Sequence, residues 1–218
     1  MTQDNKVEFS PIVIVIDTET LGRGERAVIG TISAVARNVI SKKDLGQFYT
    51  RINLEIDQPG REIHEDVTEW WDGMASSNPA AWREMFDPDL PRGDLPTALA
   101  SLAEFIAMVE AHCKPGSHVQ VMGNGPEFDN AIMAHAYESH GMPLPWSFRA
   151  NQSLRTMVWM GRLLIGIDPK YDGVFAGTQH HALHDAQHEA ATLQTIIDTL
   201  REGMPASRNT LDCEIAQI

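Results

Sequence analysis

The stretch Ile12-Val13-Ile14-Val15-Ile16-Asp17-Thr18-Glu19-Thr20 predicts a buried strand that ends in acidic residues. Five consecutive apolar β-formers are typical of a strand covered on both faces. Side chains two positions apart on a strand point to the same face, so Asp17 and Glu19 are expected to converge. Two carboxylates at such a short distance raise each other's pKa unless a cation lies between them. Mg²⁺ and Mn²⁺ suit oxygen ligands of this kind. The alternative is a strand that simply ends in a polar turn.

The sequence on either side of this strand predicts further strands and then helices. β-Branched and aromatic residues at strand-like spacing predict two antiparallel neighbours, 27–36 and 46–52, joined by a turn at 41–44. Residues 66–85 have helical character in two short pieces, and the break between them falls at Asn78-Pro79, which fits an N-cap followed by the first helical position. Residues 87–96 contain three prolines and a glycine, which predicts a loop.

The second half of the chain is mainly helical and contains one more strand. Apolar periodicity predicts helices over 95–113, 129–140, 153–164 and 182–201, a buried strand over 119–122, and a loop over 165–179. Strands followed by helices, with one late strand between them, predict an α/β fold in which helices flank a mixed sheet. We expect a single domain over residues 10–201, followed by a polar C-terminal tail over 202–218.

Composition excludes several classes of protein. The chain has 218 residues, 43% of them hydrophobic, which is enough for one sizeable core. It lacks an apolar run of about 20 residues and an apolar N-terminal leader, so we expect a cytoplasmic protein with no membrane partner. The formal net charge of −13 argues against broad, non-specific binding to nucleic acid. A nuclease that engages a strand end through cations is still compatible with this charge.

More acidic residues follow at the ends of other predicted elements. Asp129 comes after the strand 119–122 and a glycine-rich turn, where its alternative role is to cap a helix. Asp185 is expected on the inward edge of the last helix, where an unbound carboxylate is costly. His180 precedes that helix by two residues, and a histidine with a pKa near 6.5 is suited to take a proton from water.

At this point the chain resembles the DEDDh 3′-to-5′ exonucleases of the ribonuclease H-like superfamily. The resemblance rests on Asp17-x-Glu19, on Asn124-Gly125-Pro126-Glu127-Phe128-Asp129 and on His180-x-x-x-x-Asp185, in the family's order. Gly123-Asn124-Gly125, Glu69-Trp70-Trp71 and Arg155-Thr156 make it similar to the branch of the phage exodeoxyribonuclease DexA and the mycobacterial exoribonuclease RNase AS. The spacing within the second motif is longer than in many relatives and looks typical of this branch.

The resemblance implies a ribonuclease H-like sheet and a metal-dependent hydrolase. Its substrate would be the 3′ end of single-stranded DNA or RNA, its products nucleoside 5′-monophosphates, and its cofactors two Mg²⁺ or Mn²⁺ ions. Asp17 would bridge both ions, with Glu19 and Asp185 on the ion of the attacking water and Asp129 on the other. His180 would be the general base, with His181 as the alternative. Some relatives are dimers, so a homodimer is also implied.

Weaker signals surround these motifs. Candidate substrate contacts are Thr18, Leu21, Asn124, Phe128, Trp70 and Arg155. Packing is the alternative for the apolar members of this set, and a surface ion pair is the alternative for Arg155. Adjacent residues on a helix diverge by about 100°, so at most one of Trp70 and Trp71 is expected to face substrate. Gly22-x-Gly24-x-x-Ala27 matches a dinucleotide-binding pattern, but β-rich sequence follows where that fold needs a helix. The competing functional class is a non-catalytic binding module that kept the fold.

Overall fold

The acidic strand of the sequence is the central strand of a five-stranded sheet. A computed structural model describes residues 10–56 and 58–203. The strand order is β3-β2-β1-β4-β5, with β1 (Ile12–Thr20) in the middle. It pairs antiparallel with β2 (Ile29–Asn38), which pairs antiparallel with β3 (Lys43–Arg51). On its other side the short strands β4 (Gln120–Gly123) and β5 (Asn151–Ser153) run parallel to it. The predicted mixed sheet is therefore confirmed.

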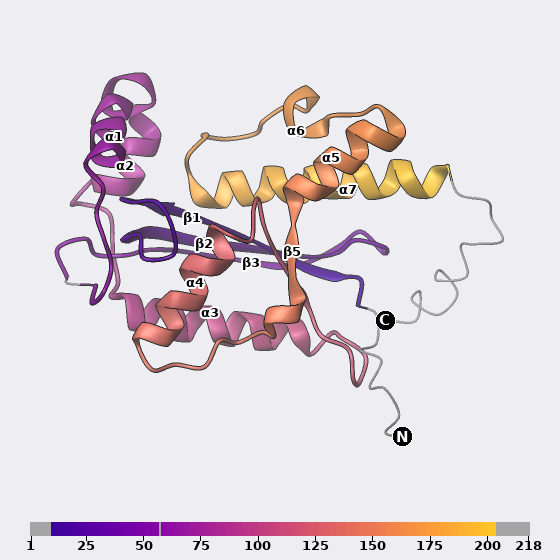
Figure 1. Ribbon diagram of the computed structural model, residues 1–218, viewed down its shortest axis with the longest axis horizontal. Helices are drawn as coiled ribbons and strands as arrows, with labels where there is room; N and C mark the ends of the chain where they lie inside the picture. The colour runs from indigo at the N-terminus through magenta and orange to yellow at the C-terminus, as the bar shows by residue number, and fades with distance from the viewer. Residues whose placement is uncertain (1–9, 57, 204–218) are drawn as a thin grey trace.

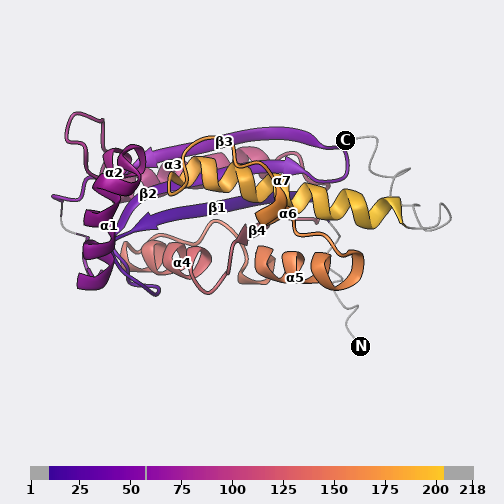
Figure 2. The same cartoon turned by 90° about the horizontal axis from the view of Figure 1, so that it is seen from above.

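Helices cover both faces of this sheet, as Figure 1 and Figure 2 show from two directions. On one face lie α3 (Leu95–Glu110) and α4 (Asp129–Ser139), and on the other lie α5 (Leu154–Ile165) and α7 (Ala182–Glu202). The predicted α/β architecture with flanking helices is confirmed. No helix within residues 10–56 and 58–203 combines the length and the apolar run needed to cross a membrane.

Successive side chains of β1 point to opposite faces of the sheet and so enter different hydrophobic cores. The isoleucines of β1 belong to the core that β1 shares with α3 and α4. Val13 and Val15 belong to the second core, which is completed by α5 and α7. Because the register continues without a break to Glu19, Asp17 and Glu19 extend the valine face toward α7.

A helical hairpin closes the end of the sheet where β1 finishes. It consists of α1 (Glu65–Ser77) and α2 (Pro79–Phe86), broken at Asn78-Pro79 as the sequence predicts. The side chain of Asn78 accepts a hydrogen bond from the backbone N–H of Ala81 and so caps α2. Trp71 is fully buried and donates from Nε1 to the Thr20 carbonyl over 2.9 Å, which attaches the hairpin to β1.

Two short elements and the start of one strand depart from the sequence prediction. β5 has only three polar residues, too few to show an alternating pattern, and depends on pairing with β4. Its Asn151 accepts hydrogen bonds from Asn130 and Trp146, contacts that no local pattern reveals. The predicted loop 165–179 contains the four-residue helix α6 (Pro169–Asp172), and β3 begins at Lys43, inside the predicted turn. The predicted tail lies outside the described residues from 204 onward.

Replacing Ile14 with alanine should lower the free energy of unfolding by about 2 to 5 kcal/mol, because Ile14 is fully buried on the face of β1 that packs against α3. Urea unfolding monitored by circular dichroism measures this loss. The same substitution at Ile63, which is 59% exposed, is the matched control and should change stability by less than about 0.5 kcal/mol. Equal effects of the two substitutions would contradict this account of the core.

Candidate active site

The end of β1 carries two carboxylates on the face that meets α7. Asp17 lies opposite Ser33 of β2 and Glu19 lies opposite Thr31, and the register shifts just after Glu19. A shift of this kind bends a strand end and re-aims its side chains. The Oδ2 atom of Asp17 is buried and has no hydrogen-bond partner. Such an atom is costly to keep in a folded protein, so the position calls for a ligand.

Asp129 reaches the same place from the neighbouring strand. Because β1 and β4 are parallel, their carboxyl ends meet at one edge of the sheet, and α4 begins there at Asp129. Its Oδ1 accepts hydrogen bonds from the backbone N–H of Thr18 over 3.2 Å and from the Thr18 hydroxyl over 2.9 Å. The alternative that Asp129 caps α4 is wrong, since the N-cap is Phe128 and there is no side-chain cap. A Cβ on Gly123 would lie 3.1 Å from that of Asp129, so glycine permits this approach.

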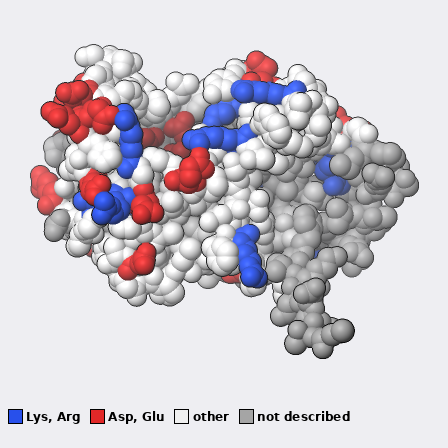
Figure 3. Space-filling model, in the orientation of Figure 1, with Lys and Arg blue, Asp and Glu red and all other residues white. Residues whose placement is uncertain are grey.

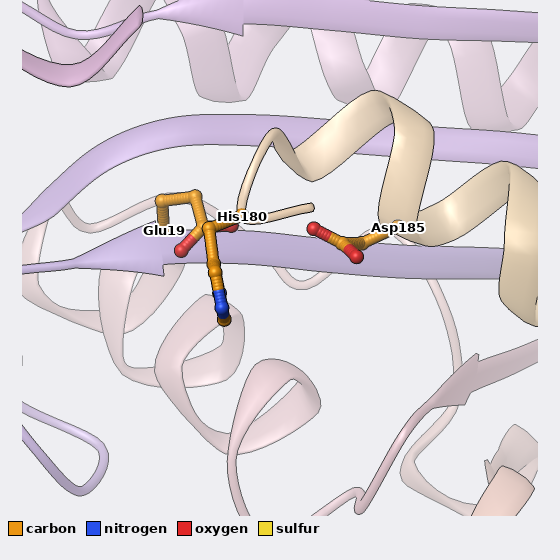
Figure 4. A group of neighbouring side chains, drawn as sticks. All are labelled: Glu19, His180 and Asp185. Atoms are coloured by element: carbon orange, nitrogen blue, oxygen red, sulfur yellow. The ribbon is translucent and has the colours of Figure 1, made fainter. Parts of the chain in front are cut away.

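The last helix supplies the remaining predicted residues. α7 begins at Ala182, whose carbonyl accepts a 2.8 Å hydrogen bond from the Ser33 hydroxyl, and this contact fixes the start of the helix over the sheet. Asp185 lies in its first turn. His180 precedes the helix with φ of 62°, a left-handed conformation that is uncommon for residues other than glycine. One ligand atom each of Glu19, His180 and Asp185 lie within 4.8 Å of one another, and Figure 4 shows these side chains gathered between β1 and α7.

The α1–α2 hairpin holds the loop that carries His180. Trp70 is 45% exposed and its ring meets the ring of His180 edge-on, with centroids 4.9 Å apart. Asn78 donates from Nδ2 to the carbonyl of Gln179 over 2.8 Å. Trp71, whose ring contacts that of Trp70 edge-on, is buried in the core. One tryptophan of the pair therefore lies beside the candidate base, and the other is structural.

Burial and mutual repulsion make the acidic cluster hard to ionise. The pKa values of Asp17 and Glu19 lie well above their usual range, first because the carboxylates are buried. The next cause is the charge of Asp129 for Asp17 and that of Asp185 for Glu19. Burial also raises the pKa of Asp129 to about 6, although the hydrogen bonds from Thr18 lower it in part. The pKa of Asp185 is raised by burial too, against the opposing charge of His180.

Two further charged residues of the site are not predicted by the sequence motifs. Glu189 lies one turn beyond Asp185 on α7, is 5% exposed, and has a pKa raised to about 8 by burial and then by the charge of Asp129. Lys170 of α6 places its Nζ 3.6 Å from Glu189 Oε1 and donates to Asn124 Oδ1 over 2.7 Å. The spacing of four residues from Asp185 was the available signal for Glu189. No signal pointed to Lys170, because it lies in a segment predicted as loop.

The structure separates the two candidate histidines. The ring of His181 stacks on those of Tyr49 and His184, with centroids 4.8 Å and 4.0 Å away, and its Nε2 is 3.7 Å from Glu84 Oε2. Burial, followed by the charge of His184, lowers the pKa of His181. Only His180 of the two belongs to the group formed with Glu19 and Asp185.

A cleft of about 410 Å³ brings most of the predicted residues together. Its lining consists of Asp17, Thr18, Glu19, Asn124, Phe128, Asp129, Arg155, Lys170, His180, Asp185, His188 and Glu189. Arg155 also forms an ion pair with Glu127, the alternative that the sequence offered. Leu21 is buried in a cluster with Trp71 and Met74, so it packs in the core, which was the alternative to a substrate contact. Figure 3 shows acidic side chains recessed beside the α1–α2 hairpin, with basic side chains near α5 and α6 bordering them.

The donor set of this cleft fits divalent cations. Carboxylate oxygens are the ligands that Mg²⁺ and Mn²⁺ prefer, and one oxygen each of Glu19 and Asp185 lie within 4.8 Å of each other, with a ring nitrogen of His180 beside them. The unpartnered Oδ2 of Asp17 and Oε2 of Glu189 are buried in the same cleft. The negative charges of Asp17 and Glu189 repel each other, and a bound cation would relieve this repulsion.

Comparison with known families agrees with this geometry. Residues 13–197 match the family model described as "3'-5' exoribonuclease Rv2179c-like domain". The chain belongs to this family. The match includes every residue of the predicted DEDDh set and falls inside the predicted domain 10–201. This Rv2179c-like chain therefore carries a 3′-to-5′ exonuclease domain. A search of the curated proteins found no significant match.

Solved structures share the fold of the Rv2179c-like domain. Cell-death related nuclease 4 (CRN-4) has a TM-score of 0.59 at 15% identity, over 87% of this chain and 64% of that one. The nuclease domain of 3′hExo, a DEDDh family member, has a TM-score of 0.55 at 13% identity, over 89% of this chain and 94% of that one. A zinc-bound complex of E. coli exonuclease I with single-stranded DNA has a TM-score of 0.57 at 15% identity, over 89% of this chain and 43% of that one. The chain thus spans less than two thirds of two of these three proteins.

In the metal-free Rv2179c-like protein, thermal stability should fall as pH rises from about 5 to 8. The folded state raises the pKa of Asp129 to about 6 and that of Glu189 to about 8, whereas unfolded carboxyls titrate near 4. The unfolded state therefore releases these protons first, and stability is lost as pH rises through the folded pKa values. Melting in EDTA across this range should show a decrease of several degrees, which Mn²⁺ should reduce. A melting temperature that rises steadily across this range would contradict the prediction.

Proposed function

We propose that this protein removes nucleotides one at a time from the 3′ end of single-stranded nucleic acid by a two-metal mechanism, releasing nucleoside 5′-monophosphates. The observation that supports it is the convergence of Asp17, Glu19, Asp129 and Asp185, from three separate elements, on one cleft beside His180. Mg²⁺ or Mn²⁺ would be the cofactor, because the donors are mainly carboxylate oxygens.

The proposed roles follow from how the carboxylates are distributed. The charge of Asp17 interacts with those of Asp129, Glu19, Glu189 and Asp185, which supports Asp17 as the ligand shared by two cations. Glu19 and Asp185 would complete the first site, and Asp129 would serve the second. When bound, the cations would activate a water and stabilise the charge on the leaving 3′ oxygen.

His180 is the proposed general base. Its ring lies beside Glu19 and Asp185, so it can take a proton from a water held there. The edge contact with Trp70 and the hydrogen bond from Asn78 to Gln179 would limit the rotation of its loop. His181 is the weaker candidate, because its ring is stacked and lies near Glu84, away from this group.

RNA is the proposed preferred substrate. The description of the matched family names an exoribonuclease, and the nuclease domain of 3′hExo was solved with rAMP. E. coli exonuclease I was solved with single-stranded DNA on the same fold, so DNA is the competing substrate. Thr18, Asn124, Phe128 and Arg155 line the cleft and are the proposed contacts to the terminal nucleotides.

A homodimer and a cytoplasmic location are further parts of the proposal. The homodimer rests on the resemblance and is supported by Trp159 and Leu163, which lie four residues apart on α5 and are 59% and 60% exposed. Exposed apolar side chains on one helix face are typical of interaction surfaces. The cytoplasmic location rests on the composition of the chain alone.

Asp185→Asn should abolish nucleotide release, because it removes a carboxylate from the proposed site of the attacking water. His180→Ala should slow turnover by about 100-fold or more while cation affinity changes little, because the residue acts on the proton rather than on the metal. Single-turnover kinetics and Mn²⁺ calorimetry measure the two effects. His112→Ala, an exposed histidine outside the cleft, is the matched control. Full activity in either site variant would contradict the assigned roles.

A direct assay separates the remaining alternatives. Single-stranded RNA and DNA of the same sequence, labelled at the 5′ end, are incubated with Mg²⁺, Mn²⁺ or EDTA. We expect ladders that shorten from the 3′ end, faster on RNA, and no cleavage in EDTA. Internal cuts, or cleavage that survives EDTA, would count against the mechanism. Binding without any cleavage would favour the non-catalytic module.

A further inference from the structure

A fifth carboxylate enters the cleft beside the four acidic residues of the DEDDh motif. Glu189 lies four residues after Asp185 on α7, so both side chains lie on the same side of the helix. Glu189 is only 5% exposed, and it lines the cleft together with the motif residues. Its Oε2 atom is buried and has no hydrogen-bond partner.

Lys170 links Glu189 to the loop that leads into Asp129, because its Nζ lies 3.6 Å from Glu189 Oε1 and donates to Asn124 Oδ1 in that loop. Among neighbouring charges, that of Asp129 acts on Glu189 most strongly. The carboxylate also interacts with Asp17, which ends β1. Glu19, His180 and Asp185 form a compact group of their own, and the charge of Asp185 also acts on Glu189. Glu189 thus lines the cleft together with Asp17 and Asp129, the two residues to which the proposed mechanism gives the second cation.

Lys170 is the positive charge nearest to this carboxylate. Its Nζ is 3.6 Å from Glu189 Oε1, too long for a good hydrogen bond, and is directed to Asn124 Oδ1 at 2.7 Å. The ion pair therefore compensates one oxygen of Glu189 incompletely and leaves the other without a partner. A purely structural ion pair would be expected to satisfy both oxygens of a carboxylate this deeply buried.

We propose that Glu189 is a fifth carboxylate ligand of the metal centre, acting with Asp17 and Asp129 on one divalent cation, and that Lys170 is its counter-ion while the metal is absent. The inference rests on the proposed two-metal function. The cation and the ammonium group compete for the same carboxylate. Removing Glu189 and removing Lys170 should therefore change metal affinity in opposite directions.

Calorimetric titration of the full-length protein with Mn²⁺ alone tests this inference without an activity readout. Glu189→Gln keeps the shape of the side chain and should weaken one class of Mn²⁺ sites by about tenfold or more. Lys170→Met should tighten Mn²⁺ binding, because it removes the competing charge. Glu104→Gln, an exposed residue of α3, changes net charge equally and should leave affinity unchanged.

Melting temperatures with and without Mn²⁺ give a second readout. In EDTA, Glu189→Gln should melt no lower than the natural protein, since a buried carboxylate that Lys170 compensates only in part is gone, and its Mn²⁺-induced rise should be smaller. Unchanged Mn²⁺ binding in Glu189→Gln, or weaker binding in Lys170→Met, would overturn the inference and leave the proposed function intact. Absence of Mn²⁺ binding by the natural protein would overturn both.

Discussion

Carboxylates that repel one another meet at the carboxyl end of β1, and nearly every element of the fold contributes to keeping them there. Pairing on both sides fixes β1, so Asp17 and Glu19 cannot turn away from the face that meets α7. Thr18 holds Asp129 with two hydrogen bonds, and Ser33 holds the start of α7 above the same spot. The hydrophobic cores on both faces supply the stability that offsets this repulsion. The result is a site whose electrostatics favour a cation.

The site is also asymmetric, and the asymmetry has a structural origin. Glu19, His180 and Asp185 form a compact group near the α1–α2 hairpin. A second group contains Asp129 and Glu189, where Lys170 of α6 pairs with Glu189 and donates to Asn124 in the loop before Asp129. Because Asp17 interacts with the carboxylates of both groups, it joins the two halves. Two cations bound in such a cleft would experience different fields, which suits the different roles of an attacking and a leaving oxygen.

The loop before α7 illustrates how a strained residue is kept in place. His180 adopts a left-handed conformation, which costs free energy outside glycine. Trp70 and Asn78 of the hairpin contact this residue and its neighbour Gln179, and the ring of the next residue, His181, stacks on those of Tyr49 and His184. The hairpin is itself attached to β1 through Trp71 and Thr20. The candidate base and the acidic strand therefore share one support.

The sequence by itself determined the central strand, the mixed sheet with flanking helices and four of the five carboxylates of the candidate site, all except Glu189. Those signals are local: an apolar run that ends in acids, a glycine-rich turn before Asp129, and a helical period that includes Asp185. Only the tertiary structure decided the rest. β5, α6, Lys170 and the choice of Trp70 over Trp71 all depend on contacts between residues far apart in the chain. Local periodicity carries no record of such contacts, because burial and charge compensation are set by which elements pack together.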